Sequence, residues 1–420
     1  MKVLWITNIP IGKIAAELFN KPMGGLWMDA MLKGLEDSPN LAMTIVTTAE
    51  VKNTICKTYD GVNYYLLPGG LPTNYNRNRN KAHEEWEQVL LAEKPDLIQV
   101  WGTEYSHSIP ALEVAKEQGI PSVVYIQGIL TAISRYADGL LPQRQMLKYI
   151  TLRDIYRKQV LAFRDRWYYK RAIKEKRIIE LSGSVIVEND WAEFFCKSIN
   201  PNLGIYRIPL NINEVFFDKE WSISNIEKYS IMSNASGPAY KGIHELLKAL
   251  LIIREKYPEV KLYIPGRSIV EKRSFINRQK VSGYWNFLSD YVRKHDLAKN
   301  IEFTGYLTQE QLSQKLSQTH VFVLASAIEN HSSSLKEAMA VGTPAVASQV
   351  GGVPEYFAHG YCGYTYRYGE AECIAGYVCR LFENEELCQQ FSQRSRKKVR
   401  EVKNDDITGM VLEMYHNIIS

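Results

Sequence analysis

Short apolar runs alternate with longer mixed segments along the first half of the chain. The runs KVLWIT, LAMTIVTT, NYYLLP, DLIQVWG and SVVYIQG have the length and the β-branched and aromatic content of strands, and residues 27–35 form a helical stretch between the first two. This alternation predicts an α/β unit with a mostly parallel sheet that is covered on both faces. In such units, ligands bind at the carboxyl ends of the strands.

The second half repeats this pattern after the run IYRIPLNIN. We expect strands at KYSIMSN, VKLYIPG, NIEFTG, HVFVLAS and TPAVAS, with helices over residues 243–256 and 309–317 between them. A length of 420 residues exceeds the usual size of one domain. The repeated pattern therefore predicts two α/β domains with a boundary near residues 212–221.

Composition indicates a folded protein without a metal or nucleic-acid motif. The hydrophobic share of 45% is ordinary for a globular chain, and the net charge of +5 is too small to require a nucleic-acid partner. The six cysteines include no C-x-x-C pair, so neither a zinc site nor a redox motif is indicated, and reduced thiols fit the cytoplasm. No apolar run approaches the ~18 residues of a spanning helix, so any membrane association is expected to be peripheral.

A basic segment lies at about residues 144–177. It carries many lysines and arginines, few acids and interleaved aromatic residues, and it has helical character. Such a segment attracts anionic surfaces. Two interpretations remain open, namely a solvated helical face, or a surface that contacts an anionic membrane or an acidic acceptor.

The stretch IENHSSSLKEAM places two acids on either side of three serines at a predicted helix start. Free amides and the helix dipole favour an anion there, and the serine hydroxyls add donors, so a phosphate fits. Glu329 would repel a phosphate at close range, and it is better placed to accept hydrogen bonds from sugar hydroxyls. Glu337 could reach a second polyol such as a ribose. Together these features indicate a nucleotide sugar, while plain helix capping beside surface glutamates is the alternative.

The longer run SAIENHSSSLKEAMAVGTPAVASQVGGVPE resembles the C-terminal signature of retaining glycosyltransferases of family 4, in which two glutamates are separated by seven residues. GGLWMDAMLKGL, PDLIQVWG, YKGIHELLKAL, KLYIPGR and IEFTGYLTQEQL fit the same family in the same order. The resemblance implies the GT-B fold, an α/β architecture of two Rossmann-like domains that face each other across a cleft. It implies an acceptor-side domain at residues 1–212, a donor domain at residues 213–399, and a last helix at about residues 400–420 that crosses back.

The resemblance also implies roles for individual residues. Glu329 would contact the donor sugar, Glu337 the ribose, and Lys241 the diphosphate, where its charge offsets the charge on the departing nucleotide. Gly24 and Gly25 would let backbone N–H groups approach the diphosphate closely. Further donor contacts would come from Tyr306 and Leu307 near the base, and from Asn330, His331, Ser332, Ser333 and Ser334 around the phosphate and sugar.

Two positions depart from the family pattern. The segment IMSNASGPAYKG lacks the arginine that usually precedes the lysine, so Arg267 after the next strand is the candidate second cation. Gln127 stands where many members have a histidine, and glutamine can hydrogen-bond but does not carry a proton at neutral pH. Glu104 and His107 are the candidates for the acceptor side, with a structural role as the alternative for the histidine.

The expected function is retaining, metal-independent transfer of a hexose from a UDP- or GDP-sugar to a glycan or lipid-linked saccharide in surface polysaccharide biosynthesis, such as that of capsule or exopolysaccharide. No metal or other cofactor is expected, because no Asp-x-Asp pair is present to hold a cation against a diphosphate. The alternatives are a nucleotide-sugar epimerase or phosphorylase on the same scaffold, or a non-catalytic nucleotide-sugar-binding partner. The expected location is the cytoplasm, including the inner face of the cell membrane.

Overall fold

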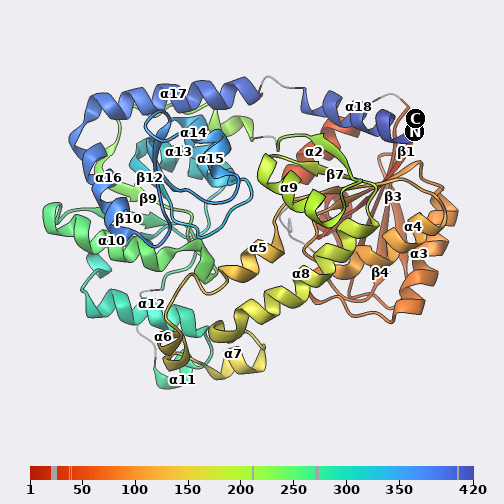
Figure 1. Ribbon diagram of the computed structural model, residues 1–420, viewed down its shortest axis with the longest axis horizontal. Helices are drawn as coiled ribbons and strands as arrows, with labels where there is room; N and C mark the ends of the chain where they lie inside the picture. The colour runs from red at the N-terminus through yellow and green to blue at the C-terminus, as the bar shows by residue number, and fades with distance from the viewer. Residues whose placement is uncertain (20–25, 37, 39, 211, 270–273, 404–405) are drawn as a thin grey trace. The chain divides into compact units, whose positions relative to one another are not determined.

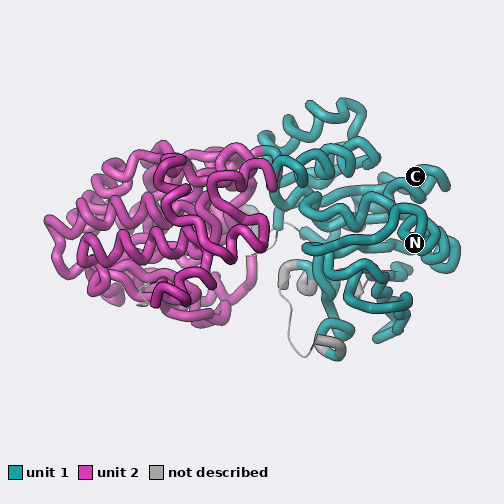
Figure 2. The backbone as a smooth tube through the Cα atoms, turned by 90° about the horizontal axis from the view of Figure 1, so that it is seen from below, with its two compact units in different colours: residues 1–131, 169–211, 406–420 teal, residues 132–168, 212–405 magenta. Residues whose placement is uncertain are grey.

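The chain divides into two compact units, which Figure 2 shows in different colours. The computed structural model describes residues 1–19, 26–36, 38, 40–210, 212–269, 274–403 and 406–420. Unit 1 comprises residues 1–131, 169–211 and 406–420, and unit 2 comprises residues 132–168 and 212–405.

Unit 1 is built on a sheet that is parallel except at one edge, where β3 and β4 pair antiparallel. In sheet order its strands are β3 (Ile55–Tyr59), β4 (Val62–Pro68), β2 (Ala42–Ala49), β1 (Lys2–Ile6), β5 (Leu97–Trp101), β6 (Ser122–Tyr125), β7 (Ser184–Val187) and β8 (Gly204–Arg207). The five runs predicted as strands in the first half are confirmed, as is the helix α2 (Leu26–Glu36). The other helices of unit 1 are α1 (Gly12–Phe19), α3 (Arg79–Glu93), α4 (Ile109–Glu117), α9 (Asp190–Ile199) and α18 (Ile407–Ile419).

A buried hydrogen-bonded chain fixes the C-terminal helix α18 on the sheet of unit 1. The indole Nε1 of Trp5 on β1 donates to the hydroxyl of Tyr415, which donates to Gln99 on β5, at 2.9 and 2.7 Å. Trp101 packs edge-on against Trp5 and is stacked on Tyr125 of β6. Because polar groups in an apolar core are costly unless paired, these contacts specify where α18 packs.

Unit 2 contains a second, wholly parallel sheet, visible with its helices in Figure 1. In sheet order its strands are β11 (Ile301–Phe303), β10 (Lys261–Ile264), β9 (Glu227–Met232), β12 (Thr319–Leu324), β13 (Ala345–Ser348) and β14 (Gly363–Tyr366). Every residue of β12 is buried, as expected for a strand in the interior of a sheet that is covered on both faces. The surrounding helices are α10 (Ile243–Lys256), α12 (Gly283–Lys294), α13 (Gln309–Gln318), α14 (Ser333–Val341), α15 (Val353–Tyr356), α16 (Ala371–Glu383) and α17 (Glu385–Lys403).

Residues 132–168 group with unit 2, whereas the sequence-based division assigned them to the domain at residues 1–212. The reason is a set of contacts with the region before α12, such as the hydrogen bond from Thr151 Oγ1 to the carbonyl of Val281 at 2.9 Å. The chain passes from unit 1 to unit 2 within the helix α5 (Leu130–Arg135) and returns to unit 1 within α8 (Arg164–Leu181). The helices α6 (Gln143–Lys148) and α7 (Leu152–Tyr156) lie between them in the sequence. Within the described ranges, no helix combines the length and apolar character that crossing a bilayer requires.

Candidate functional site

The candidate site in unit 2 lies at the carboxyl edge of its sheet. All six strands run parallel, so the loops that follow them leave at the same edge. The sheet order places the loop after β9, which carries Lys241, beside the loop after β12, which carries Glu329. The loops after β10 and β11 carry Arg267 and Tyr306.

Lys241 and Glu329 form an ion pair with 2.6 Å between Nζ and Oε1. The side chain of Lys241 is 31% exposed and that of Glu329 is 13% exposed, so the pair is sheltered yet reachable from solvent. Ser326 Oγ donates to the same carboxylate oxygen at 2.6 Å. The structure therefore brings together the two residues on which the predicted chemistry depends most.

Gly242 explains how the lysine loop comes so close to the end of β12. Its φ of 76° lies in the left-handed region, and a Cβ built at this position would overlap the carbonyl oxygen of Ala325. The neighbouring carbonyl of Tyr240 accepts a hydrogen bond from the amide of Ala327 at 2.7 Å. The YKG motif thus has a packing reason for its glycine, which holds Lys241 beside Glu329.

The start of α14 supplies hydroxyls and helix amides next to this ion pair. Ser332 is the N-cap, and its Oγ accepts from the amide of Leu335 at 3.4 Å and lies 3.2 Å from the hydroxyl of Ser334. The first turn contains no acidic residue, so nothing on the helix itself opposes an anion at this end. Asn330 and Ser332 are buried, Ser333 is exposed, and His331 packs edge-on against Tyr356.

Glu337 lies one turn further along α14. Burial raises the pKa of its carboxyl to about 7, because a poorly solvated site disfavours the charged form. Since residues four apart share a helix face, Glu337 lies on the same face as Ser333. Its side chain is only partly buried, which leaves it accessible to a polar partner.

Two glycines join the neighbouring loops after β10 and β11. Arg267 follows the first glycine, and Tyr306 and Leu307 follow the second. The amide of Gly266 donates to the carbonyl of Gly305 at 2.7 Å in an isolated antiparallel bridge. Arg267 is exposed and Tyr306 is 81% exposed, whereas Leu307 packs against the core of unit 2. The leucine is therefore available to a ligand mainly through its backbone.

Glu104 and Gln127 lie at the carboxyl edge of the sheet in unit 1, after β5 and β6. Burial is the main cause that raises the pKa of Glu104 to about 7. Its Oε2 accepts from Asn8 Nδ2 at 3.0 Å, and Arg171 donates to its backbone carbonyl. Gln127 is partly buried.

His107 lies in the interior of unit 1. Its Nε2 donates to the carbonyl of Thr7 at 3.0 Å, and burial lowers its pKa to about 4. A neutral, buried imidazole of this kind favours the structural role over contact with an acceptor. Gly24 and Gly25, the two predicted phosphate-loop glycines, lie outside the described residues.

Glu175 is a buried acid that sequence reasoning missed. Its Oε1 accepts from the amide of Leu130 and from Thr103 Oγ1, and its Oε2 accepts from both the amide and the hydroxyl of Thr131, at 2.7 to 3.1 Å. This carboxylate holds the start of α5 at the point where the chain leaves unit 1. The available signal was an acid in the middle of a largely basic helix.

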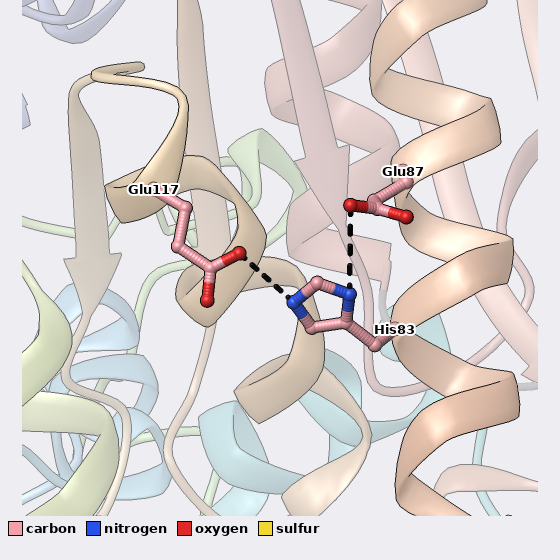
Figure 3. Close-up of side chains that lie close together, drawn as sticks. All are labelled: His83, Glu87 and Glu117. Carbon is pink, nitrogen blue, oxygen red and sulfur yellow. Dashed lines mark hydrogen bonds and ion pairs between the residues drawn. The ribbon is translucent and has the colours of Figure 1, made fainter.

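A group that could hold a metal, among the described residues, lies on two helices of unit 1. It consists of His83 and Glu87 on α3 and Glu117 on α4. Figure 3 shows the two carboxylates at opposite ring nitrogens, with Glu117 at 3.0 Å from Nε2 and Glu87 at 3.8 Å from Nδ1. The imidazole therefore lies between carboxylates of two helices, and these carboxylates do not converge on one of its nitrogens.

A family model matches the part of the chain that contains Lys241 and Glu329, and curated relatives match about a third of the chain. The model is described as glycosyl transferases group 1 and matches residues 216–398. N-acetyl-alpha-D-glucosaminyl L-malate synthase of Bacillus anthracis is 30% identical over 30% of this chain, and the amylovoran biosynthesis glycosyltransferase AmsK of Erwinia amylovora is 26% identical over 34%. These matches span 33% and 38% of the two relatives' own lengths.

Solved structures resemble the chain over nearly its whole length. Sucrose-phosphate synthase from Thermosynechococcus elongatus matches with a TM-score of 0.70 at 16% identity, and HepE of Anabaena, in complex with UDP and glucose, matches with 0.63 at 13%. Each match covers 99% of both chains. At such low identity these likenesses establish the fold, and the predicted α/β GT-B class is confirmed. The chain therefore has the GT-B fold, and its residues 216–398 match the family model described as glycosyl transferases group 1.

Proposed function

We propose that the chain is a retaining glycosyltransferase that moves a hexose from a UDP- or GDP-sugar to a glycan or lipid-linked saccharide. The observation that carries this proposal is the contact between Lys241 and Glu329 beside the start of α14. A cation and free helix amides suit a diphosphate, and an acid that accepts hydrogen bonds suits a sugar. The amylovoran relative and the UDP and glucose bound to HepE support a nucleotide-sugar donor and a role in surface polysaccharide biosynthesis.

Lys241 is the group that offsets charge on the departing nucleotide in this proposal. Its ammonium is paired with Glu329, so a bound diphosphate competes with the carboxylate for the same cation. Ser326 retains a hydrogen bond to Glu329, which keeps the carboxylate oriented when Lys241 turns to phosphate. Glu329 is then available to hydroxyls of the donor sugar.

The transfer step breaks the bond between the anomeric carbon and the diphosphate oxygen and forms a bond to the acceptor oxygen on the same face. The acceptor proton passes to the departing phosphate oxygen, so glutamine at position 127 suffices as a hydrogen-bonding residue. The amides of α14 and the charge of Lys241 take the electrostatic role that a metal has elsewhere. Arg267 is the proposed second cation, Tyr306 and Leu307 the base contacts, and Glu104 the acceptor-side group.

The experiment has two stages. Nucleotide sugars are first screened for thermal stabilisation, because a ligand that prefers the folded state raises the Tm. The stabilising donor is then offered with saccharide acceptors, with and without a chelator, and the anomeric configuration of the product is determined.

We expect a UDP- or GDP-sugar to stabilise the protein, and a product that keeps the donor's anomeric configuration. Glu329→Ala should lower turnover by about 100-fold or more. The matched control is Glu255→Ala, which removes an exposed acid on α10. Turnover unchanged in Glu329→Ala, or an inverted product, would refute the proposal, and loss of turnover with the chelator would refute metal independence.

A non-catalytic nucleotide-sugar-binding partner is the second candidate. It is favoured by two departures from the family pattern, the missing arginine in IMSNASGPAYKG and the glutamine at position 127. Such a protein would be stabilised by the donor but would release no nucleotide with any acceptor. Measurement of nucleotide release therefore separates the two candidates.

A further inference from the structure

Helix α7 in unit 2 has its polar side buried and its apolar side exposed. Asp154 is only 3% exposed, while Leu152, Ile155 and Tyr156 are 67%, 58% and 88% exposed. This is the reverse of what a helix on the surface of a globular unit normally shows. The apolar side chains of α7 are therefore available to a partner outside the unit.

The inverted orientation of α7 is fixed by hydrogen bonds to the segment before α12. Asp154 Oδ2 accepts from the amide of Gly283 at 2.6 Å, and the amide of Arg153 donates to the carbonyl of Gln279 at 3.1 Å. A Cβ at Gly283 would overlap the carbonyl oxygen of Tyr149, so the two segments are in close backbone contact. The exposure of the apolar side chains is thus a property of the packed structure.

A second apolar element lies next to α7, although it is more than a hundred residues away in the sequence. The short helix α11 (Phe275–Arg278) exposes Phe275 at 78% and Ile276 at 69%, and Figure 1 shows it beside α7. Arg278 is held by both carboxylate oxygens of Asp290 on α12, each at 2.8 Å. We term the exposed apolar side chains of these neighbouring elements the apolar surface: Leu147, Leu152, Ile155, Tyr156, Phe163, Phe275 and Ile276.

Exposed basic side chains accompany the apolar surface. Arg166 lies over the ring of Phe163, with 5.4 Å from its guanidinium carbon to the centroid. Asp154 is buried, which leaves Asp165 as the exposed acid among residues 140–168. The exposed basic residues of the same elements are Arg144, Lys148, Arg157, Lys158, Arg166 and Lys280.

We propose that the apolar surface docks on a lipid membrane with anionic headgroups. Apolar side chains that enter the acyl boundary, with lysines and arginines at headgroup level, are the combination by which interfacial segments bind anionic bilayers. A second copy of the chain is the alternative occupant, and the test below separates it from a membrane. Of the basic segment predicted at residues 144–177, the proposal keeps residues 144–168, which lie in unit 2, and it adds α11. It does not depend on the proposed donor chemistry.

The test is co-sedimentation of the full chain with vesicles of phosphatidylcholine alone and of phosphatidylcholine with 30 mol% phosphatidylglycerol, the second being about one-third anionic lipid. The variant Ile155→Gln/Tyr156→Gln removes two exposed apolar side chains without touching Asp154. The matched control is Leu91→Gln, which alters a side chain that is 71% exposed on α3 of unit 1.

We expect the wild type to bind the anionic vesicles, the double variant to bind them about tenfold or more weakly, and Leu91→Gln to bind like the wild type. Stabilisation by the donor should be the same in all three proteins, so a failure here is distinct from a failure of the proposed function. Absence of binding to anionic vesicles, or equal binding by the double variant, would overturn the proposal. A wild-type dimer in solution that the double variant dissociates would assign the apolar surface to a second copy instead.

Discussion

Glu337 is an acid that its surroundings keep partly neutral. Burial raises its pKa to about 7, so near neutral pH the carboxyl is a mixture of both forms. Ribose hydroxyls that donate to this carboxyl would stabilise the ionised form and lower its pKa in the complex. Binding of the donor would then release a proton.

This linkage predicts a pH-dependent donor affinity. If the pKa of Glu337 falls from about 7 to below 6 on binding, the affinity for a nucleotide sugar rises about tenfold from pH 6 to pH 8. Calorimetric titrations across this range measure the effect, and Glu337→Gln should bind without it. An affinity of the wild type that is flat with pH would show that Glu337 does not meet the ribose.

At the scale of elements, the loop between β9 and α10 depends on one glycine. In Gly242→Ala, the added methyl group meets the carbonyl of Ala325 and the residue keeps a positive φ, so we expect a loss of about 1–3 kcal/mol of stability. Displacement of Lys241 should also weaken donor binding. Thermal unfolding with and without donor measures both effects.

Gly237→Ala is the matched control for this loop. Gly237 also has a positive φ, of 135°, but a Cβ there would meet no atom within 4 Å. This variant carries backbone strain without the overlap, and it should lose stability while keeping more of its donor affinity. Equal donor affinity in Gly242→Ala and the wild type would contradict the role assigned to the close contact.

The helix α18 depends on the hydroxyl of Tyr415. Tyr415→Phe leaves Trp5 Nε1 and Gln99 Oε1 without this buried partner, at a cost of about 1–3 kcal/mol. Hydrogen exchange followed by mass spectrometry should show faster exchange in α18, with little change in the helices of unit 2. Tyr361→Phe alters a half-exposed ring and serves as the control. Unchanged exchange in α18 would show that apolar packing alone holds the helix.

At the scale of the whole molecule, features set by consecutive residues were predicted better than features that depend on contacts between distant residues. Strand runs and the YKG and IENHSSS motifs are written in consecutive residues, which is why the two sheets and the neighbourhood of Lys241 and Glu329 could be anticipated. The strands β3, β7, β8 and β14 were not predicted.

The assignment of residues 132–168 to unit 2 had no local signal. It depends on hydrogen bonds such as that from Thr151 to Val281, whose partners are 130 residues apart. The interior position of His107 also depends on a distant contact, because its partner is the carbonyl of Thr7, in the loop that follows β1. Side chains that serve such distant contacts look like surface residues in the sequence.

The central claim is that one ligand meets both Lys241 and Glu329, and calorimetry with paired ligands tests it most directly. Lys241→Met should weaken the nucleoside diphosphate and the nucleotide sugar alike, by about tenfold or more, because both carry the phosphates. Glu329→Gln should leave the nucleoside diphosphate bound at least as tightly, because it frees Lys241, and should remove the added affinity that the sugar provides. Nucleotide-sugar affinity that is unchanged in both variants would contradict the account.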